Sequence, residues 1–235
     1  MKKRFIIILL LLYGCREGPN EQYKENLVVF SFLCPNIAEQ VVYVDRTYTF
    51  DEVADTTGVS GATCKLQDSS GTTIFSERNN VGSYFSLSGW ELNPLTTYNL
   101  EVSYKDYLVK AHTTVPDMFN IISPLDEDTI NLSSPPAYFA WSKSEASAIY
   151  NVWLLAEGDA NMPFLSLVTF DTILSVPPTF SDYFDSTGWY ILKVVAKDTN
   201  YYERGRGQSL VDTLEGGLGF VGSLTFDSVR VYIKK

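Results

Sequence analysis

The chain has 235 residues, and its 28 Asp and Glu outnumber its 18 Lys and Arg, which gives a formal net charge of −10. Such an acidic balance lacks the positive footprint of nucleic-acid-binding proteins, and charge alone does not hold such a chain on an anionic membrane. A single histidine argues against histidine-based zinc sites and against histidine-dependent catalytic triads.

The N-terminus carries the pattern of a bacterial lipoprotein signal. A basic start, an apolar run and a small residue precede a cysteine in the stretch KKRFIIILLLLYGC, which ends at Cys15. The apolar run is shorter than the roughly 20 residues of a membrane-spanning helix. We therefore expect cleavage of residues 1–14 and stable membrane anchoring through lipid on Cys15. Removal of the signal leaves 15 Lys and Arg and a net charge of −13.

The remainder of the chain is predicted to be all-β. Residues 15–26 are polar and contain Gly18 and Pro19, which indicates a lipidated tether. From residue 27 onward Tyr, Phe, Val, Thr and Ile dominate, and turn residues recur about every 8 to 12 positions, as in β-sandwiches. We expect two tandem immunoglobulin/fibronectin III-like sandwiches, at residues 27–116 and 117–235, and no amphipathic helix.

The first sandwich is expected to contain seven strands, at residues 27–34, 41–50, 60–67, 72–76, 83–88, 96–104 and 107–115. The run from Asp68 to Gly71 predicts a turn, and Lys105 with Asp106 predicts a tight hairpin. In the stretch LNPLTTYNLEV, Tyr98 stands where the tyrosine corner of immunoglobulin-like sandwiches bonds back to upstream backbone. This segment resembles the corner of a fibronectin type III domain.

The second sandwich is expected to pack on Trp141, which follows Phe139 and precedes an alternating Tyr150-x-Val152-x-Leu154 run. Further strands are predicted at residues 164–170 and 172–176, at the alternating run that includes residues 190–196, and at residues 228–233. Residues 198–222 are rich in Gly, Tyr and Arg and are predicted to form a long loop. Such loops are often functional.

Candidate chemical groups are few. Cys34 and Cys64 both fall on core-facing positions, and the sequence leaves a disulfide and two buried thiols equally open. Gly217-x-Gly219-x-x-Gly222 matches a dinucleotide-binding pattern, but the context lacks the following helix, so these glycines indicate close backbone approach instead. His112 alternates with core residues and is expected to face solvent. No catalytic, metal or cofactor-binding residues are predicted.

The aromatic surplus is the better indication of a binding role. Tyr, Phe and Trp make up 14% of the chain, and several lie at predicted strand ends or loops, including Tyr183, Phe184 and Trp90. We expect Tyr201, Tyr202, Arg204 and Arg206 in the late loop to contact a partner, because aromatic and arginine side chains dominate binding energy at interfaces. The bland alternative, in which these aromatics only close the ends of the sandwiches, fits equally well.

Several short patterns resemble the DUF4249-type lipoproteins of Bacteroidetes. They are Cys15, the stretch VSGA at residues 59–62, Gly82-x-Tyr84, TYNLEV at residues 97–102, TVP at residues 114–116 and LEGGLGF at residues 214–220. The resemblance implies an envelope lipoprotein alongside TonB-dependent outer-membrane receptors and supplies no catalytic residues. Arg16 stands where an Asp often signals retention in the inner membrane, so we expect the outer membrane. The absence of catalytic constellations favours a non-enzymatic role. The partner is expected to be an outer-membrane receptor or a glycan. A carbohydrate-active module and a structural spacer remain the alternatives.

Overall fold

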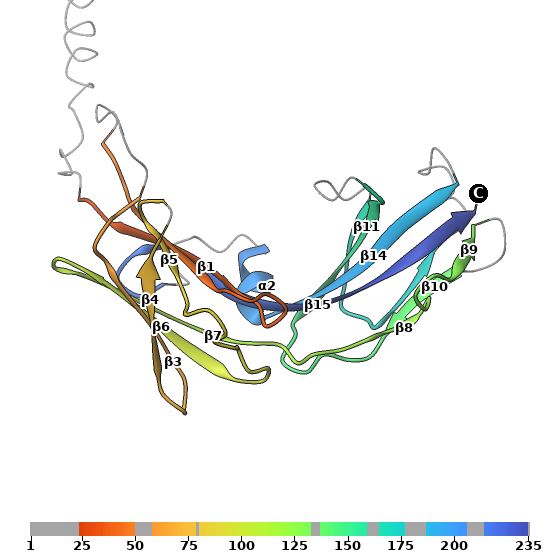
Figure 1. Cartoon of the computed structure of the whole chain (residues 1–235), viewed down its shortest axis with the longest axis horizontal. Coiled ribbons are helices and arrows are strands. Elements are labelled where there is room, and N and C mark those ends of the chain that lie inside the picture. The colour runs from red at the N-terminus through yellow and green to blue at the C-terminus, as the bar shows by residue number, and fades with distance from the viewer. Residues whose placement is uncertain are drawn as a thin grey trace, which may run out of the picture.

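The computed structural model describes residues 24–49, 58–78, 80–132, 137–158, 165–176, 187–205 and 214–234, which form two β lobes with one short helix between them (Figure 1). Each lobe has its own hydrophobic core. The predicted all-β sandwich class is therefore confirmed. Residues 1–23, with the expected signal and Cys15, lie outside this description. Within it, no helix has the length and apolar character needed to cross a membrane.

The first lobe is a sandwich of two layers. One layer contains β1 (Leu27–Leu33), β2 (Val41–Arg46) and β5 (Ser83–Phe85), and the other contains β3 (Thr63–Gln67), β4 (Thr72–Glu77), β6 (Thr97–Tyr104) and β7 (Tyr107–Thr114). Alternate residues of each strand face the shared core, as Leu27, Val29 and Leu33 do on β1. All seven strands expected from the alternating pattern are present, with ends that differ by a few residues.

The second lobe also has two layers. The larger contains β9 (Thr129–Asn131), β11 (Ile149–Ala156), β12 (Leu165–Thr169) and β14 (Gly188–Lys197), and the smaller contains β8 (Ile121–Ser123), β10 (Ala137–Trp141) and β13 (Ile173–Val176). Trp141 lies in this core and packs against Tyr150 with ring centroids 5.5 Å apart. Its expected role as the central aromatic residue of the second core is confirmed.

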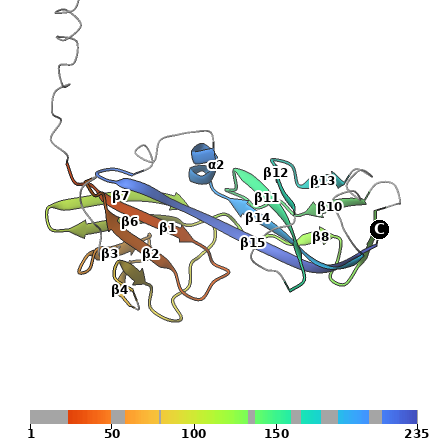
Figure 2. The ribbon, with the colours of Figure 1, turned by 90° about the horizontal axis from the view of Figure 1, so that it is seen from above.

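The last strand, β15 (Leu218–Lys234), runs through both lobes and joins their layers in one sheet (Figures 1 and 2). Residues 218–223 pair in parallel with β1, and residues 224–233 pair antiparallel with β14. Leu214 and Val221 consequently belong to the first core. The expected boundary between sandwiches at residues 27–116 and 117–235 stays a prediction, and in the structure the C-terminal segment contributes to both lobes.

The long loop predicted at residues 198–222 is wrong at both ends. Its start forms the helix α2 (Thr199–Gly205), and its end is already part of β15. The glycine content concealed the strand. At Gly219 the backbone has φ +124°, and a Cβ atom there would collide with the carbonyl of Val29 on β1. The strand can therefore approach β1 only because this position has no side chain. This agrees with the prediction that these glycines allow close backbone approach.

Predicted turn chemistry is present in both lobes. The Tyr98 hydroxyl accepts a hydrogen bond from the Asn93 N–H at 2.9 Å, which confirms the tyrosine corner. In the second lobe the Tyr150 hydroxyl accepts one from the Ser144 N–H at 2.9 Å, an equivalent device that the sequence did not indicate. Asp68 closes its turn by accepting from the Gly71 N–H at 2.9 Å. The two corners fix how each chain segment enters its core.

Candidate binding face

One outer face of the joined sheet is unusually aromatic. Side chains of β14 alternate, and while Leu192 and Val194 enter the second core, Lys193 and Lys197 point to the opposite face. There they meet side chains from β11, β15 and α2, and α2 lies against β15 between the lobes (Figure 1). We call this surface the junction face, and it consists of Phe32, Trp153, Phe170, Lys193, Lys197, Tyr201, Tyr202, Arg204, Phe220 and Phe226.

Aromatic rings form the floor of the junction face. Tyr201 of α2 stacks on Phe32 of β1 with ring centroids 5.6 Å apart, and it meets Phe220 of β15 edge-on at 4.9 Å. Tyr202 meets Phe170, beyond the end of β12, at 5.5 Å. Aromatic pairs in these geometries stabilise beyond the area that they bury. The helix is therefore held on the sheet by rings from both lobes.

Cations lie on these rings. The Lys193 ammonium stands 3.7 Å from the ring centre of Phe226, the Lys197 ammonium 4.8 Å from that of Tyr201, and the Arg204 guanidinium 4.8 Å from that of Phe220. Among the residues that the structure describes, no carboxylate oxygen lies within 4.0 Å of any of the three cations. The face is thus positive within a chain of net charge −10.

Burial alters the titration of this face. It lowers the pKa of Lys193 and of Lys197, because desolvation disfavours a charged ammonium, and at Lys193 the nearby Cys34 partly offsets the effect. It raises the pKa of Tyr201 for the corresponding reason, with Asp198 adding to the rise and Arg204 opposing it. The two lysines are therefore only partly solvated, and no described carboxylate pairs with them to compensate for their burial.

A buried carboxylate positions α2. Asp198 directly precedes the helix, and its Oδ1 accepts from the Tyr201 N–H at 3.1 Å, as an N-cap does. Its Oδ2 accepts from the Ser223 N–H at 3.0 Å and from the hydroxyl of Thr113 on β7. Asn200 adds hydrogen bonds to the carbonyls of His112 and Val221, both at 2.8 Å. Helix, first lobe and central strand are thus fixed relative to one another.

The structure brings together three of the four residues expected to contact a partner. Tyr201, Tyr202 and Arg204 lie on α2 within the junction face, and Arg206 lies outside the described residues. The side chain of Tyr201 is less exposed to solvent than its predicted loop position implied, because its ring packs between Phe32 and Phe220.

The remaining aromatics take other places. Tyr183 and Phe184 lie outside the description, and Trp90 packs on the first core against Phe75 and Tyr98. For Trp90 the alternative, in which the aromatic side chain only closes the end of the sandwich, is therefore correct.

Sequence reasoning missed Lys193 and Lys197. The signal was present, because once Leu192 and Val194 are assigned to the core, the opposite face of the strand carries Trp189, Ile191 and Val195 as well as the two lysines. A solvated face would show fewer apolar residues. The partners of these positions on β1 and β15 depend on pairings distant in sequence, so the full face was not predictable.

Cys34 and Cys64 are free buried thiols, and no disulfide joins them. The disulfide alternative is therefore wrong. Cys34 follows β1 and Cys64 lies in β3, and these strands belong to opposite layers with β2, β5 and β4 between them in the sheet order. Burial raises the pKa of both thiols, that of Cys64 to about 12, so neither is a reactive thiolate.

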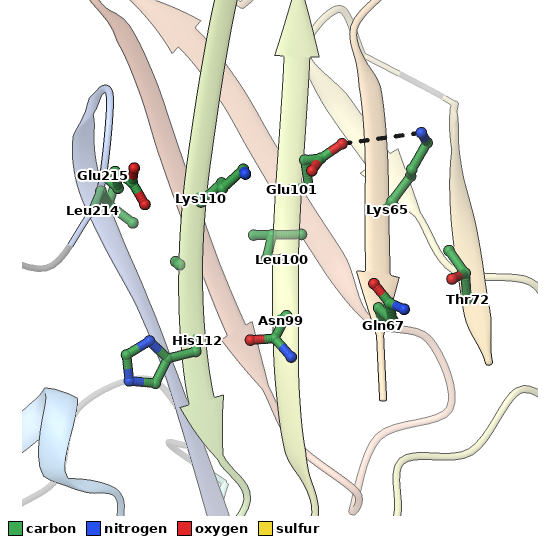
Figure 3. A pocket seen from close by; sticks show the side chains of 11 residues that line it. Lys65, Gln67, Thr72, Asn99, Leu100, Glu101, Lys110, His112, Leu214 and Glu215 are labelled. Atoms are coloured by element: carbon green, nitrogen blue, oxygen red, sulfur yellow. Dashed lines mark ion pairs between the residues drawn. The ribbon is translucent and has the colours of Figure 1, made fainter. Parts of the chain in front are cut away.

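A concavity lies on the opposite layer of the first lobe. This polar groove, of about 810 Å³, is lined from β3, β6, β7 and the segment before β15 by Lys65, Gln67, Asn99, Glu101, Lys110, His112 and Glu215, among others (Figure 3). Lysines and glutamates balance there, and Lys65 pairs with Glu101 at 4.0 Å. His112 is exposed as predicted, and no described carboxylate or hydroxyl bonds its side chain. No described cluster of three or more metal-ligating side chains exists.

A family model described as a domain of unknown function, DUF4249, matches residues 18–202, which is most of the chain. The chain belongs to the DUF4249 family. The resemblance to the DUF4249 family is thereby confirmed. No curated protein matches this DUF4249 chain.

Solved structures resemble the DUF4249 chain only distantly. They include the FN1-FN3 domains of chicken CNTN1, with 11% identity over 88% of this chain and a TM-score of 0.36. The BSP domain of a biofilm associated protein has 12% identity over 89% and a TM-score of 0.25. Three N-terminal domains of the bacteriophage RB49 outer capsid protein Hoc have 11% identity over 89% and a TM-score of 0.24. The chain spans 66%, 30% and 59% of those structures, less than two thirds of each.

Proposed function

We propose that this DUF4249 chain is a lipid-anchored protein of the cell envelope that acts as a non-enzymatic binding or accessory module through its junction face. The observation that carries the proposal is the set of three cations, at Lys193, Lys197 and Arg204, that lie on aromatic rings and have no carboxylate partner among the described residues. Lys193 and Lys197 are half-buried, and partly buried charges cost stability unless they are paired. Their retention on one face supports a role in contact with a ligand or partner.

The anchor in this proposal is Cys15, and the family resemblance supports a place beside a TonB-dependent receptor of the outer membrane. Two acyl chains give stable anchoring where one gives only reversible binding. We expect a Cys15→Ser variant to leave the membrane fraction and to lose incorporation of labelled fatty acid. A variant that still fractionates with carbonate-washed membranes would contradict the anchor, while leaving the binding face untouched.

Binding is tested by purification from membranes in mild detergent, with charge reversal at Lys193 and Lys197. Deleting residues 198–222 would remove Asp198 and the start of β15, so point substitutions are the sharper probe. The matched control is charge reversal at Lys65 and Lys110 of the polar groove. We expect the face variant alone to lose co-purifying material. An unchanged set would instead favour a spacer, and glycan turnover by the purified protein would favour a carbohydrate-active module.

A further inference from the structure

Lys193 and Lys197 of the junction face differ from the other described cations, because they are half-buried and form no ion pair with a described carboxylate. The described half-buried cations elsewhere have carboxylate partners, as Arg46 has Glu25 at 2.7 Å and Arg230 has Glu157 at 2.8 Å, whereas cations without an ion pair, such as Lys110, are exposed to solvent. An acidic chain has carboxylates in excess, yet no carboxylate of the described residues lies within 4.0 Å of the cations of this face. The natural complement of such a surface is an anion supplied by another molecule.

The positions of the two lysines determine how the acidic groups of the ligand must be spaced. Lys193 and Lys197 are four positions apart on one face of β14, which places their Cα atoms about 13 Å apart at the usual rise of a strand. Arg204 on α2 extends the positive surface beyond Lys197. The ammonium groups of both lysines lie 5.9 Å from the ring centre of Trp153, so a ligand that meets all three cations must carry several acidic groups around this ring and α2.

The aromatic rings around the cations indicate the chemistry of the part of the ligand that connects its acidic groups. Phe32 is 40% exposed and Phe170 is 64% exposed, one on each side of α2. A sugar ring can cover such side chains with its C–H face while its equatorial hydroxyls stay in water. A peptide laid across the same face would bury backbone amides, and the adjoining outward positions of β11 and β12 offer few polar partners beyond Asn151 and Ser166.

We propose that the junction face binds an acidic glycan, with uronate carboxylates on Lys193, Lys197 and Arg204 and with sugar rings against Phe32 and Phe170. This inference rests on the proposed binding function and names its ligand class. A bound carboxylate also restores the favourable environment that burial denies the two ammonium groups, whose pKa values it would raise again. No covalent step is involved.

The test is calorimetric titration of the whole protein with a defined oligogalacturonate, with its methyl ester and with poly-L-glutamate. We expect the oligogalacturonate to bind, and the methyl ester, which keeps the sugar rings but lacks the charge, to bind at least tenfold more weakly. Lys193→Gln/Lys197→Gln should lose at least tenfold in affinity, and Lys193→Arg/Lys197→Arg should retain most of it. Lys65→Gln/Lys110→Gln in the polar groove is the control and should bind normally.

Several outcomes would overturn the inference. They are absence of oligogalacturonate binding, equal binding of the ester, equal binding by the glutamine variant, or equally tight binding of poly-L-glutamate, which would mark an acidic peptide site. Circular dichroism of each variant verifies the fold, and the arginine variant keeps the test decisive if the glutamine variant unfolds. Loss of co-purifying material on charge reversal, together with absent oligogalacturonate binding, would refute the glycan and leave the proposed binding function intact.

Discussion

Replacing Asp198 tests whether one buried carboxylate holds the helix and the two lobes in register. Only 3% of the residue is exposed, and it accepts hydrogen bonds from Thr113 on β7, from Ser223 on β15 and from Tyr201 on α2. In an Asp198→Ala variant the two hydroxyls can still bond one another, because Thr113 Oγ1 and Ser223 Oγ are 2.7 Å apart. The two backbone donors cannot.

The expected loss follows from those two donors. The Ser223 N–H would be buried without an acceptor, which costs about 1–3 kcal/mol. The Tyr201 N–H would lose its cap, which costs about 0.5–2 kcal/mol. We therefore expect Asp198→Ala to lower the free energy of unfolding by about 2–4 kcal/mol. The free energy of unfolding of a folded domain is typically about 5–15 kcal/mol. A loss of this size is a large fraction of that value and is readily measured.

The pH dependence gives a second readout. Burial raises the pKa of Asp198 above its ordinary value of 3.8, although its hydrogen bonds from Thr113, Tyr201 and Ser223 oppose the rise. Between pH 3.8 and the raised pKa the folded chain keeps a proton that the unfolded chain has lost. The contribution of Asp198 to stability is therefore full below pH 3.8 and falls as the pH rises through this window. Asp198→Asn lacks this titration.

Urea unfolding followed by tryptophan fluorescence, at a series of pH values, measures both effects. The stability difference between the wild-type protein and Asp198→Asn should narrow as the pH rises above about 4. The exposed hairpin residue Asp106 supplies the control variant, Asp106→Asn, for which no such trend is expected. The reasoning would be refuted if Asp198→Ala lowered the free energy of unfolding by less than about 1 kcal/mol, the contribution of a single weak hydrogen bond. It would also be refuted if the stability difference between the wild-type protein and Asp198→Asn widened as the pH rises.

Three further predictions concern the framework. Gly219→Ala should lower the free energy of unfolding by about 3 kcal/mol or more, because it adds a collision to a strained backbone, whereas Gly71→Ala, in open space, should change it by less than about 0.5 kcal/mol in the same urea assay. Tyr98→Phe should cost about 1–2 kcal/mol in thermal unfolding, because it removes the acceptor of a partly buried backbone N–H. Cys34 and Cys64 should react with a thiol reagent only after unfolding, without added reductant.

Each of these has a clear contrary result. A Gly219→Ala variant as stable as the open-loop control would contradict the close pairing of β15 with β1. A Tyr98→Phe variant with unchanged thermal stability would show that the hydrogen bond of the tyrosine corner does not stabilise the fold. Absence of free thiols in the unfolded, unreduced chain would restore the disulfide.

Local patterns predicted much of this fold. Alternating apolar residues identified the strands of the first lobe because one face of each strand is buried and the other is not. The tyrosine corner at Tyr98 and the turn at Asp68 were predictable because their hydrogen bonds close within a few residues of sequence. Trp141 was identified as a core residue since a large aromatic on an alternating strand has few other places to go.

Long-range pairings escaped prediction. The parallel pairing of β15 with β1 joins residues nearly 200 positions apart, and no local pattern in a glycine-rich segment indicates it. The helix α2 was missed because it is short, and its stability comes from its Asp198 cap and from rings on other strands. The junction face needed both features, so its aromatic residues on α2 were predicted and its lysines on β14 were not.

Site-specific photocrosslinking in intact cells tests most directly whether the junction face is where this protein meets its ligand. A benzophenone amino acid would replace Phe32 on this face or, as control, Ile74, which is 56% exposed on the outer face of β4 in the opposite layer. Benzophenone captures C–H bonds of proteins and glycans alike. We predict ultraviolet-dependent adducts from position 32 and none from position 74. Adducts from position 74 alone, or equal adducts from both, would contradict the account.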